Sequence, residues 1–264
     1  MGGFGGGLGI GSVVIVLLAS AISGFDPRIL LDGGMPVPVE QSRQATNSPA
    51  VAEARDFVAV VLGDTEQTWG ELFRRDGKTY REPKLALFSG AVELACGFVQ
   101  AAIGLFYCPA DQRVDVDLSF FAELRQRFRA PSDFAQTYVI AHEVGHHLQS
   151  LLGIATRVRI AQRRLSRAEA NAQQVRMELQ ADCFSGLWAH HAERARRVLE
   201  EGDIKEALNA ATAIGDGRLQ RQAQGRVVPD SFTHGTSTQR VGWFKRGLES
   251  GELKSCDTFG GGPP

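Results

Sequence analysis

Two histidines and a glutamate form the pattern H-E-x-x-H at residues 142–146, within an apolar run that favours a helix. On a helix, positions i and i+4 share a face, so His142 and His146 can offer two imidazole nitrogens to one metal ion. Zinc accepts such ligands and, in a catalytic site, keeps one position for water. Glu143 lies beside them, where a carboxylate can take a proton from that water. The spacing indicates a zinc hydrolase; the alternatives are a structural metal site and a buried histidine pair.

A third ligand is expected from residues 176–184. Residues 166–169, Ser-Arg-Ala-Glu, resemble a capping box, and the Ala-, Gln-, Glu- and Arg-rich sequence that follows favours a long helix. Glu178 and Asp182 then share one helical face. Glu178 could complete the metal site, and Asp182 could accept the other ring N–H of a ligand histidine. Without the first motif, a solvated helix face would explain this pair equally well.

The elements that must position these residues can also be read from the sequence. Pro131-Ser132-Asp133 is a helix start for the H-E-x-x-H segment, with Ser132 or Asp133 as N-cap. Residues 51–73 favour a helix. Residues 104–108 and 114–118 favour two strands joined by a turn at 109–112.

On these residues the chain resembles the putative neutral zinc metallopeptidase family of bacteria. The resemblance covers nearly all of the chain and is carried by Cys96-Gly97 and residues 106–109, 140–147, 178–183, 228–235 and 255–259. It implies a zincin-like α+β fold, rich in helices with a small sheet or hairpin, one catalytic Zn²⁺ and peptidase activity. The Glu-x-x-x-Asp arrangement is also similar to that of the gluzincin peptidases, where the glutamate is a ligand and the aspartate supports the site. Those positions are Glu178 and Asp182.

A donor for the oxyanion that forms during attack on a peptide carbonyl is also needed. His234 is the candidate, because residues 233–240 resemble the Thr-His-Pro…Arg stretch of prenyl-protein-type endopeptidases, with Gly235 replacing the proline. Asp230, Arg240 or both could orient the site. The alternative is that His234 caps, or lies exposed at the start of, a helix near residues 237–248.

The remaining histidines and two tyrosines are weaker candidates for residues of the site. His147 lies about 100° round the helix from His146, so it is expected to pack or to support the ligands. His190 and His191 are expected on a polar helix face. Tyr107 and Tyr138 are weaker candidates for the oxyanion donor, and both are expected to lie in the core.

These interpretations predict a zinc-dependent endopeptidase that acts on a peptide or protein. His142, His146 and Glu178 would bind zinc, Glu143 would be the general base, Asp182 would support the site and His234 would polarise the oxyanion. Two alternatives remain: a catalytically silent, metal-stabilised scaffold that binds peptides, and a zinc hydrolase of a non-peptide amide.

Length, charge and composition limit the number of domains and the classes of partner that are expected. The chain has 264 residues and a net charge of −1, which suits one enzyme-sized domain, expected at residues 51–258, plus appendages. There is no basic stripe with interleaved aromatic residues, so nucleic acid is not expected as a partner. The sequence does not indicate the oligomeric state.

The first 25 residues carry no charge and are strongly aliphatic around residues 13–18. They predict a membrane anchor or an export signal, with Ala19-Ser20-Ala21 fitting a cleavage site; a buried Gly-rich helix is the alternative. Residues 26–50 have linker composition, and residues 259–264 are expected to be disordered. The location would be the bacterial cell envelope, with the catalytic domain outside the cytoplasm.

Four cysteines allow three disulfide connectivities in an exported domain. We favour a disulfide between Cys96 and Cys108, which would cross-link the strand pair. A second disulfide between Cys183 and Cys256 would hold the C-terminal tail against the Glu178 helix. A second metal site is the rival, although Cys-x-x-Cys spacing is absent. Free buried thiols are expected instead if the domain is cytosolic.

Overall fold

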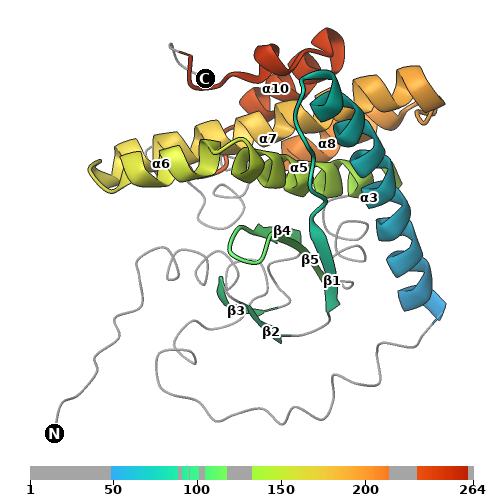
Figure 1. Cartoon of the computed structure of the whole chain (residues 1–264), viewed down its shortest axis with the longest axis horizontal. Helices are drawn as coiled ribbons and strands as arrows, with labels where there is room; N and C mark the ends of the chain where they lie inside the picture. The colour runs from blue at the N-terminus through green and yellow to red at the C-terminus, as the bar shows by residue number, and fades with distance from the viewer. Residues whose placement is uncertain are drawn as a thin grey trace, which may run out of the picture. The chain divides into compact units, whose positions relative to one another are not determined.

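The computed structural model describes residues 49–88, 91–94, 96–100, 105–117, 133–213 and 231–260. All described elements belong to one unit, residues 45–264. The expected N-terminal hydrophobic segment, most of the expected linker, Ser132, Asp230 and residues 261–264 lie outside the described residues. The architecture is α+β, rich in helices, with a small sheet (Figure 1).

Helix α3, Pro49–Arg75, confirms the helix expected at residues 51–73 and begins two residues earlier, within the expected linker. Its buried side chains recur at helical spacing and form one stripe: Val58, Val61, Leu62, Thr65, Thr68, Trp69 and Phe73. Asp64 on this helix accepts hydrogen bonds from Trp188 Nε1 and from the guanidinium of Arg196. These bonds tie α3 to helix α7.

The main sheet has the strand order β1-β5-β4. Strands β4, Leu105–Cys108, and β5, Arg113–Asp117, pair antiparallel across a turn at 109–112, so the predicted hairpin is confirmed. Strand β1, Lys84–Phe88, pairs parallel with β5, from Lys84 opposite Arg113 to Phe88 opposite Asp117. Strand β1 was not expected from the sequence, because its residues show no polar–apolar alternation. A separate antiparallel pair is formed by β2, Ala91–Leu94, and β3, Gly97–Gln100.

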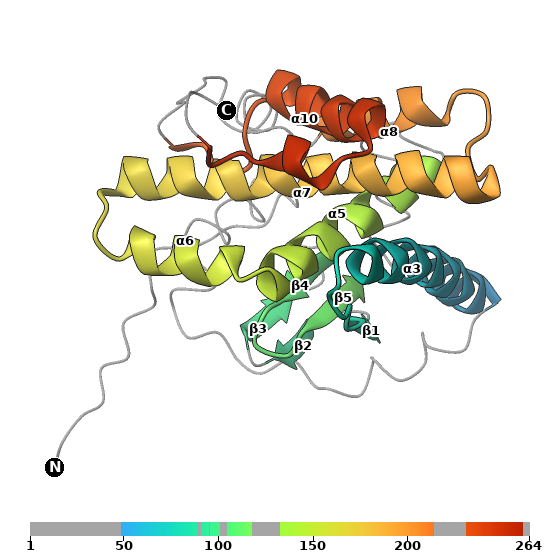
Figure 2. The same ribbon diagram turned by 45° about the horizontal axis from the view of Figure 1, so that its top comes forward.

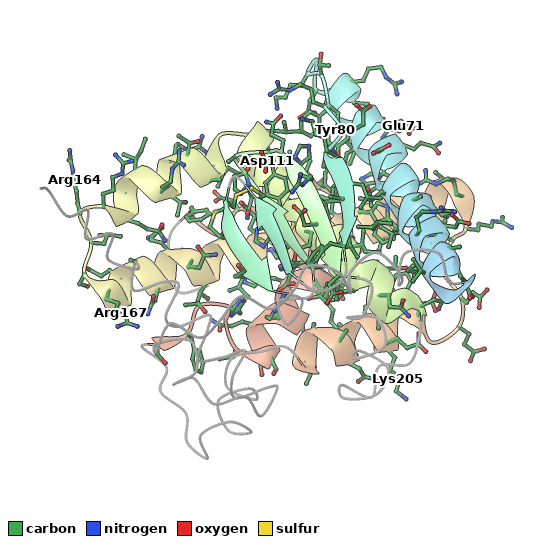
Figure 3. All side chains as sticks on the ribbon, turned by 90° about the horizontal axis from the view of Figure 1, so that it is seen from below. Glu71, Tyr80, Asp111, Arg164, Arg167 and Lys205 are labelled. Carbon is green, nitrogen blue, oxygen red and sulfur yellow. A yellow bond between two sulfur atoms is a disulfide. The ribbon has the colours of Figure 1, made fainter. Side chains whose placement is uncertain are left out.

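Helices α5, Asp133–Leu151, and α7, Arg167–Arg196, form the centre of the unit. Helix α5 packs on β4 and β5 on one side and on α7 on the other, and α7 also packs on α10, Ser237–Ser250 (Figure 2). Helix α6, Ile154–Gln162, continues from α5 and turns back into α7. Arg164 and Arg167 mark this turn, at the far end of the α6–α7 pair from α3 (Figure 3).

Several local signals in the sequence are confirmed. The capping box at the start of α7 is present: Ser166 accepts from the Glu169 N–H, and the Glu169 carboxylate accepts from the Ser166 N–H. Helix α10 matches the helix expected near residues 237–248. The described residues also form α8, Asp203–Ala213, and the short 3-10 helix η5, Leu253–Cys256.

Two disulfides have the favoured connectivity. Cys96 is bonded to Cys108, and Cys183 in α7 is bonded to Cys256 in η5. The second bond holds the C-terminal segment against the helix that carries Glu178. Within the part of the chain that the structure describes, no helix has the length and apolarity needed to cross a membrane.

Candidate metal centre

The structure brings His142, His146 and Glu178 together. The two histidines share one face of α5, and the glutamate faces them from α7. His142 Nε2 lies 3.2 Å from Glu178 Oε2, and His146 Nε2 lies 3.6 Å from Glu178 Oε1. One donor atom of each residue lies within 4.8 Å of the other two. The predicted ligand set is therefore assembled in space.

The donor atoms suit a zinc ion. Ligand atoms about 2.0–2.2 Å from zinc in a tetrahedron lie about 3.3–3.6 Å from one another. The two measured Nε2–carboxylate separations, 3.2 and 3.6 Å, lie at or close to this range. Two imidazoles and one carboxylate also form one of the usual three-residue sets of catalytic zinc sites, which leave a fourth position for water.

Asp182 supports His142. Its Oδ1 lies 2.8 Å from His142 Nδ1, and an ionised carboxylate only accepts, so Nδ1 donates and Nε2 faces the cluster. Tyr138 OH also donates to Oδ1. Arg240, from α10, donates from Nε to Oδ2 at 2.8 Å and from Nη2 to Oδ1 at 2.9 Å. Both carboxylate oxygens of this buried aspartate are thus satisfied.

The two carboxylates from α7 stay ionised despite burial. Burial by itself would raise the pKa of Glu178, but His146, together with hydrogen bonds from His142 and His146, holds that pKa well below its ordinary value. Burial opposes ionisation of Asp182 in the same way, and the charge of Arg240 and the hydrogen bond from His142 lower its pKa. Two ionised carboxylates therefore lie at the candidate metal site, where negative charge would favour a bound cation.

Glu143 is buried beside the cluster, in the position expected of a base. Burial raises its pKa, and the charges of His146 and His142 and a hydrogen bond from the backbone N–H of Tyr107 only partly offset that effect. A carboxylate with a raised pKa binds a proton more readily, which suits a group that must accept one.

His234 lies near the cluster without belonging to it. Its charge contributes to lowering the pKa of Glu178, yet it is not among the residues whose donor atoms form the cluster. The N-cap of α10 is Thr236, so the alternative that His234 caps this helix is wrong. His234 is half-buried, and its Nδ1 lies 3.0 Å from Thr233 Oγ1. Its role as oxyanion donor remains a prediction.

Comparison with known proteins decides the family. The family described as "Putative neutral zinc metallopeptidase" matches residues 1–259. The chain belongs to this family. The uncharacterized protein YpfJ of Escherichia coli (strain K12) is 53% identical over 248 residues, 94% of this chain and 85% of the relative. The uncharacterized protein Rv2575 of Mycobacterium tuberculosis is 38% identical over 223 residues, 79% of this chain and 73% of the relative. No solved structure was found to match.

The other histidines of this family member are structural. His147 Nε2 lies 2.6 Å from the carbonyl oxygen of Arg81, which can only accept, so Nε2 donates and Nδ1 receives the hydroxyl of Tyr107. His147 thereby joins α5 to β4, as expected for a packing residue. His190 and His191 donate to the carbonyls of Leu248 and Gly251 and hold α7 against the end of α10. The polar helix face expected for them is half-buried rather than solvated.

Two glutamines were missed by the sequence analysis. Gln149 Oε1 lies 2.9 Å from His146 Nδ1, and Gln149 Nε2 lies 3.2 Å from Gln180 Oε1. A signal was available for Gln149, because it follows His146 by three residues and so shares its helical face. Gln180 lies between Glu178 and Asp182 in sequence but on another face of α7, and no pattern connects it to the site.

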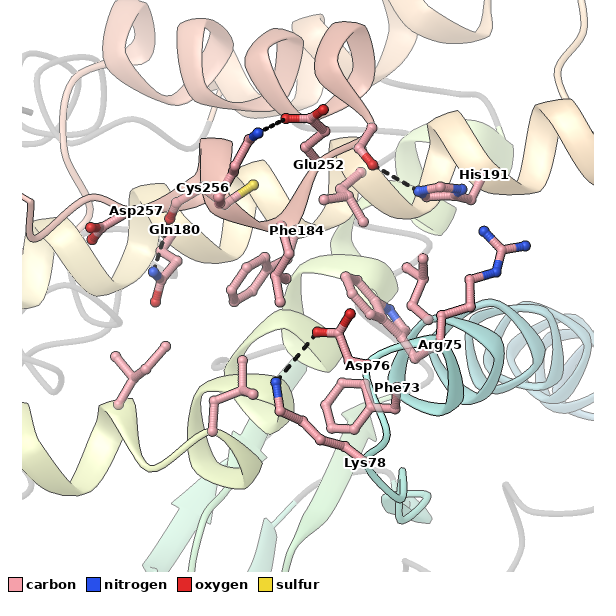
Figure 4. Close-up of a pocket in the computed structure, with 18 of the residues that line it drawn as sticks. Phe73, Arg75, Asp76, Lys78, Gln180, Phe184, His191, Glu252, Cys256 and Asp257 are labelled. Carbon is pink, nitrogen blue, oxygen red and sulfur yellow. Dashed lines mark hydrogen bonds and ion pairs between the residues drawn. The ribbon is translucent and has the colours of Figure 1, made fainter.

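A pocket of about 740 Å³ lies between α3, α7 and η5, lined in part by Phe73, Phe184 and Cys256 (Figure 4). None of its lining residues belongs to the metal cluster. The pocket and the cluster of ionisable groups therefore lie at different places in the structure. We assign the candidate centre from the ionisable groups.

Proposed function

We propose that this protein is a zinc-dependent endopeptidase. The observation that carries the proposal is the cluster of His142, His146 and Glu178, with His142 and Glu178 buried, His146 partly buried and Glu143 beside them on the same helix as the histidines. When bound there, zinc would lower the pKa of a water molecule to about 7 and polarise a carbonyl group. The family description supports the same class of activity, and the relatives compared above are uncharacterized.

Four residues around the cluster have tasks in this mechanism. Glu143 takes the proton of the attacking water and passes it to the leaving amine, a role that its raised pKa favours. Asp182 keeps the proton of His142 on Nδ1, and Arg240 holds Asp182 in place from α10. His234 would stabilise the negative charge that develops on the peptide oxygen.

A peptide substrate is supported by the position of β4, which lies at an edge of the three-stranded sheet. The backbone N–H of Tyr107 in this strand is bonded to Glu143, so the open edge of β4 runs beside the candidate centre. An extended peptide can add to such an edge as a further strand through backbone hydrogen bonds. This pairing would place a peptide bond next to Glu143.

The test compares the full chain with Glu143→Gln, both purified with disulfides intact, for zinc content and for cleavage of casein or mixed peptides. We expect one zinc per chain in both proteins and at least about a 100-fold lower cleavage rate in the variant, because the general base is removed while the ligands remain. Zinc in both with cleavage in neither would favour the silent scaffold. Cleavage of small amides alone would favour a non-peptide amidase, and absence of zinc would refute the site.

We further propose that the protein works in the bacterial cell envelope, with the metal centre outside the cytoplasm. Two disulfides support this location, because structural disulfides persist mainly in oxidising compartments. The uncharged segment at residues 1–25 supports it from the sequence.

A further inference from the structure

The two candidate ligand histidines differ in what holds their second ring nitrogen. His142 Nδ1 faces the carboxylate of Asp182, whereas His146 Nδ1 faces the neutral amide of Gln149, at 2.9 Å. Gln149 lies one turn further along α5 and is fully buried. The mechanism above gives this side chain no task, although it touches a predicted ligand directly.

The orientation of the Gln149 amide follows from its other contacts. Its Nε2 lies 2.7 Å from the backbone carbonyl oxygen of Met177. A carbonyl oxygen can only accept, so the amide nitrogen must face Met177 and the amide oxygen must face His146. His146 must then carry its proton on Nδ1. When the ring is neutral, its Nε2, 3.6 Å from Glu178 Oε1, then has a lone pair for a metal ion.

The contacts of Gln180 require the same orientation of the Gln149 amide. Its Nε2 lies 2.9 Å from the carbonyl oxygen of Cys256, so its own amide oxygen must face Gln149. Figure 4 shows this bond between Gln180 and Cys256 at the border of the 740 Å³ pocket. Cys256 is held in turn by its disulfide with Cys183 in α7. The carbonyl oxygens of Met177 and Cys256 can only accept hydrogen bonds. They therefore determine which atom donates in each hydrogen bond that links Gln180, Gln149 and His146.

We propose that Gln149 and Gln180 are positioning residues of the metal centre, which fix the tautomer and ring orientation of His146 through this chain of amides. Groups that hold the second nitrogen of a ligand histidine commonly change metal affinity by about 10- to 100-fold when removed. The inference rests on the metal site of the proposed function, but it does not require that the protein cleave peptides.

The competing explanation is that both glutamines only join α5 to α7. Replacing Gln149 by glutamate separates the two explanations. A glutamate keeps the acceptor for His146 Nδ1, but it places a carboxylate oxygen against the carbonyl of Met177, where the amide nitrogen now donates. Gln149→Glu should therefore lose at least as much stability as Gln149→Leu while keeping the contact that matters for the metal.

The experiment measures the zinc dissociation constant of the full chain, with disulfides intact, by competition with a chromophoric chelator. Urea unfolding of the metal-free proteins is measured beside it. We expect Gln149→Leu to raise the dissociation constant about 10- to 100-fold and Gln180→Leu to raise it by less. Gln149→Glu should stay within about threefold of the parent, because the acceptor is retained. Gln162→Leu in α6 is the matched control, since its amide donates to the carbonyl of Ala170 away from the site, and its zinc affinity should not change.

Parent-like zinc affinity in Gln149→Leu would overturn the inference. The inference would also be overturned if Gln149→Leu and Gln149→Glu lost zinc affinity to the same extent and in proportion to their loss of stability. A parent chain that binds zinc but cleaves no peptide would refute the proposed peptidase and still let the variants decide this inference. A parent chain without zinc would refute both.

Discussion

Arg240 shows how a single residue from a third helix supports the centre. Its guanidinium is 2% exposed and forms two hydrogen bonds with Asp182, which in turn bonds His142. Because Asp182 is fully buried, its ionised state depends on the charge of the arginine. The positive charge also offsets part of the negative charge that Glu178 and Asp182 place in the interior.

We expect Arg240→Leu to lower the free energy of unfolding by about 3–5 kcal/mol, because it leaves a buried carboxylate without its main partner. Urea unfolding of the metal-free chain measures the change. Arg246→Leu is the control in the same helix: this exposed arginine lies over the ring of Trp243, and its loss should cost at most about 1 kcal/mol. Equal losses in the two variants would contradict the role given to Arg240.

His146 gives a pH dependence to the metal-free protein. Burial would lower its pKa, but the neighbouring carboxylate of Glu178 outweighs burial and raises the pKa to about 9. The folded pKa thus lies above the value of about 6.5 in the unfolded chain. The stabilisation from this proton is complete below pH 6.5 and is lost as the pH rises through 9.

Accordingly, the free energy of unfolding of the metal-free chain should fall by about 1 kcal/mol per pH unit between pH 7 and pH 9. Urea unfolding at several pH values measures the slope. His146→Gln should flatten it, because the titrating group is gone. An unchanged slope in that variant would show that another group is responsible.

At the scale of elements, α7 and α10 approach so closely that their backbones touch at two glycines. A Cβ atom at Gly186 would lie 2.0 Å from the carbonyl oxygen of Phe244, and one at Gly247 would lie 2.0 Å from that of Cys183. Any larger residue must push the helices apart. This approach brings Arg240, one to two turns before the contact, within reach of Asp182.

Gly247→Ala should therefore destabilise the protein by about 1–3 kcal/mol, because the added methyl group overpacks a contact between two backbones. Thermal or urea unfolding measures this. Gly242→Ala is the matched control on the same helix, since nothing lies within 4 Å of a Cβ there. It should stabilise the protein by about 0.5–1 kcal/mol, because alanine favours a helix more than glycine does. Stabilisation by both substitutions would refute the close approach.

At the scale of the whole molecule, the proposed location depends on the N-terminal segment. Residues 1–25 carry no charge, and the first described element after them is α3, which begins at Pro49. An anchored chain would keep the metal centre close to the membrane surface. A processed chain would release it outside the cytoplasm, so the two outcomes imply different access to substrates.

Expression of the full chain in a bacterial host, followed by fractionation and mass measurement, tests the location. We expect the full chain in the membrane fraction, or a shortened chain in the periplasm if the segment is cleaved near residue 21. Val14→Asp combined with Leu17→Asp should abolish both outcomes, because charges in the apolar run oppose insertion. A full-length chain in the cytoplasm, unaffected by these substitutions, would contradict the proposal.

The sequence by itself determined the local features of this protein. The H-E-x-x-H spacing placed His142 and His146 on one helical face, and the Ser166–Glu169 capping box placed the start of α7. Both signals depend only on residues within one or two turns, and helical geometry is the same wherever the helix packs. The β4–β5 hairpin was predictable for the same reason, because a short turn joins its strands.

Other contacts between distant side chains were decided only by the tertiary structure. The parallel pairing of β1 with β5, the orientation of Gln149 by Met177 and Gln180, and the glycine contact between α7 and α10 all join segments far apart in the chain. The partners of Asp182 come from α5 and α10, and no sequence period relates these helices. Such contacts depend on how helices pack against one another, and packing is set by the whole core rather than by any local pattern.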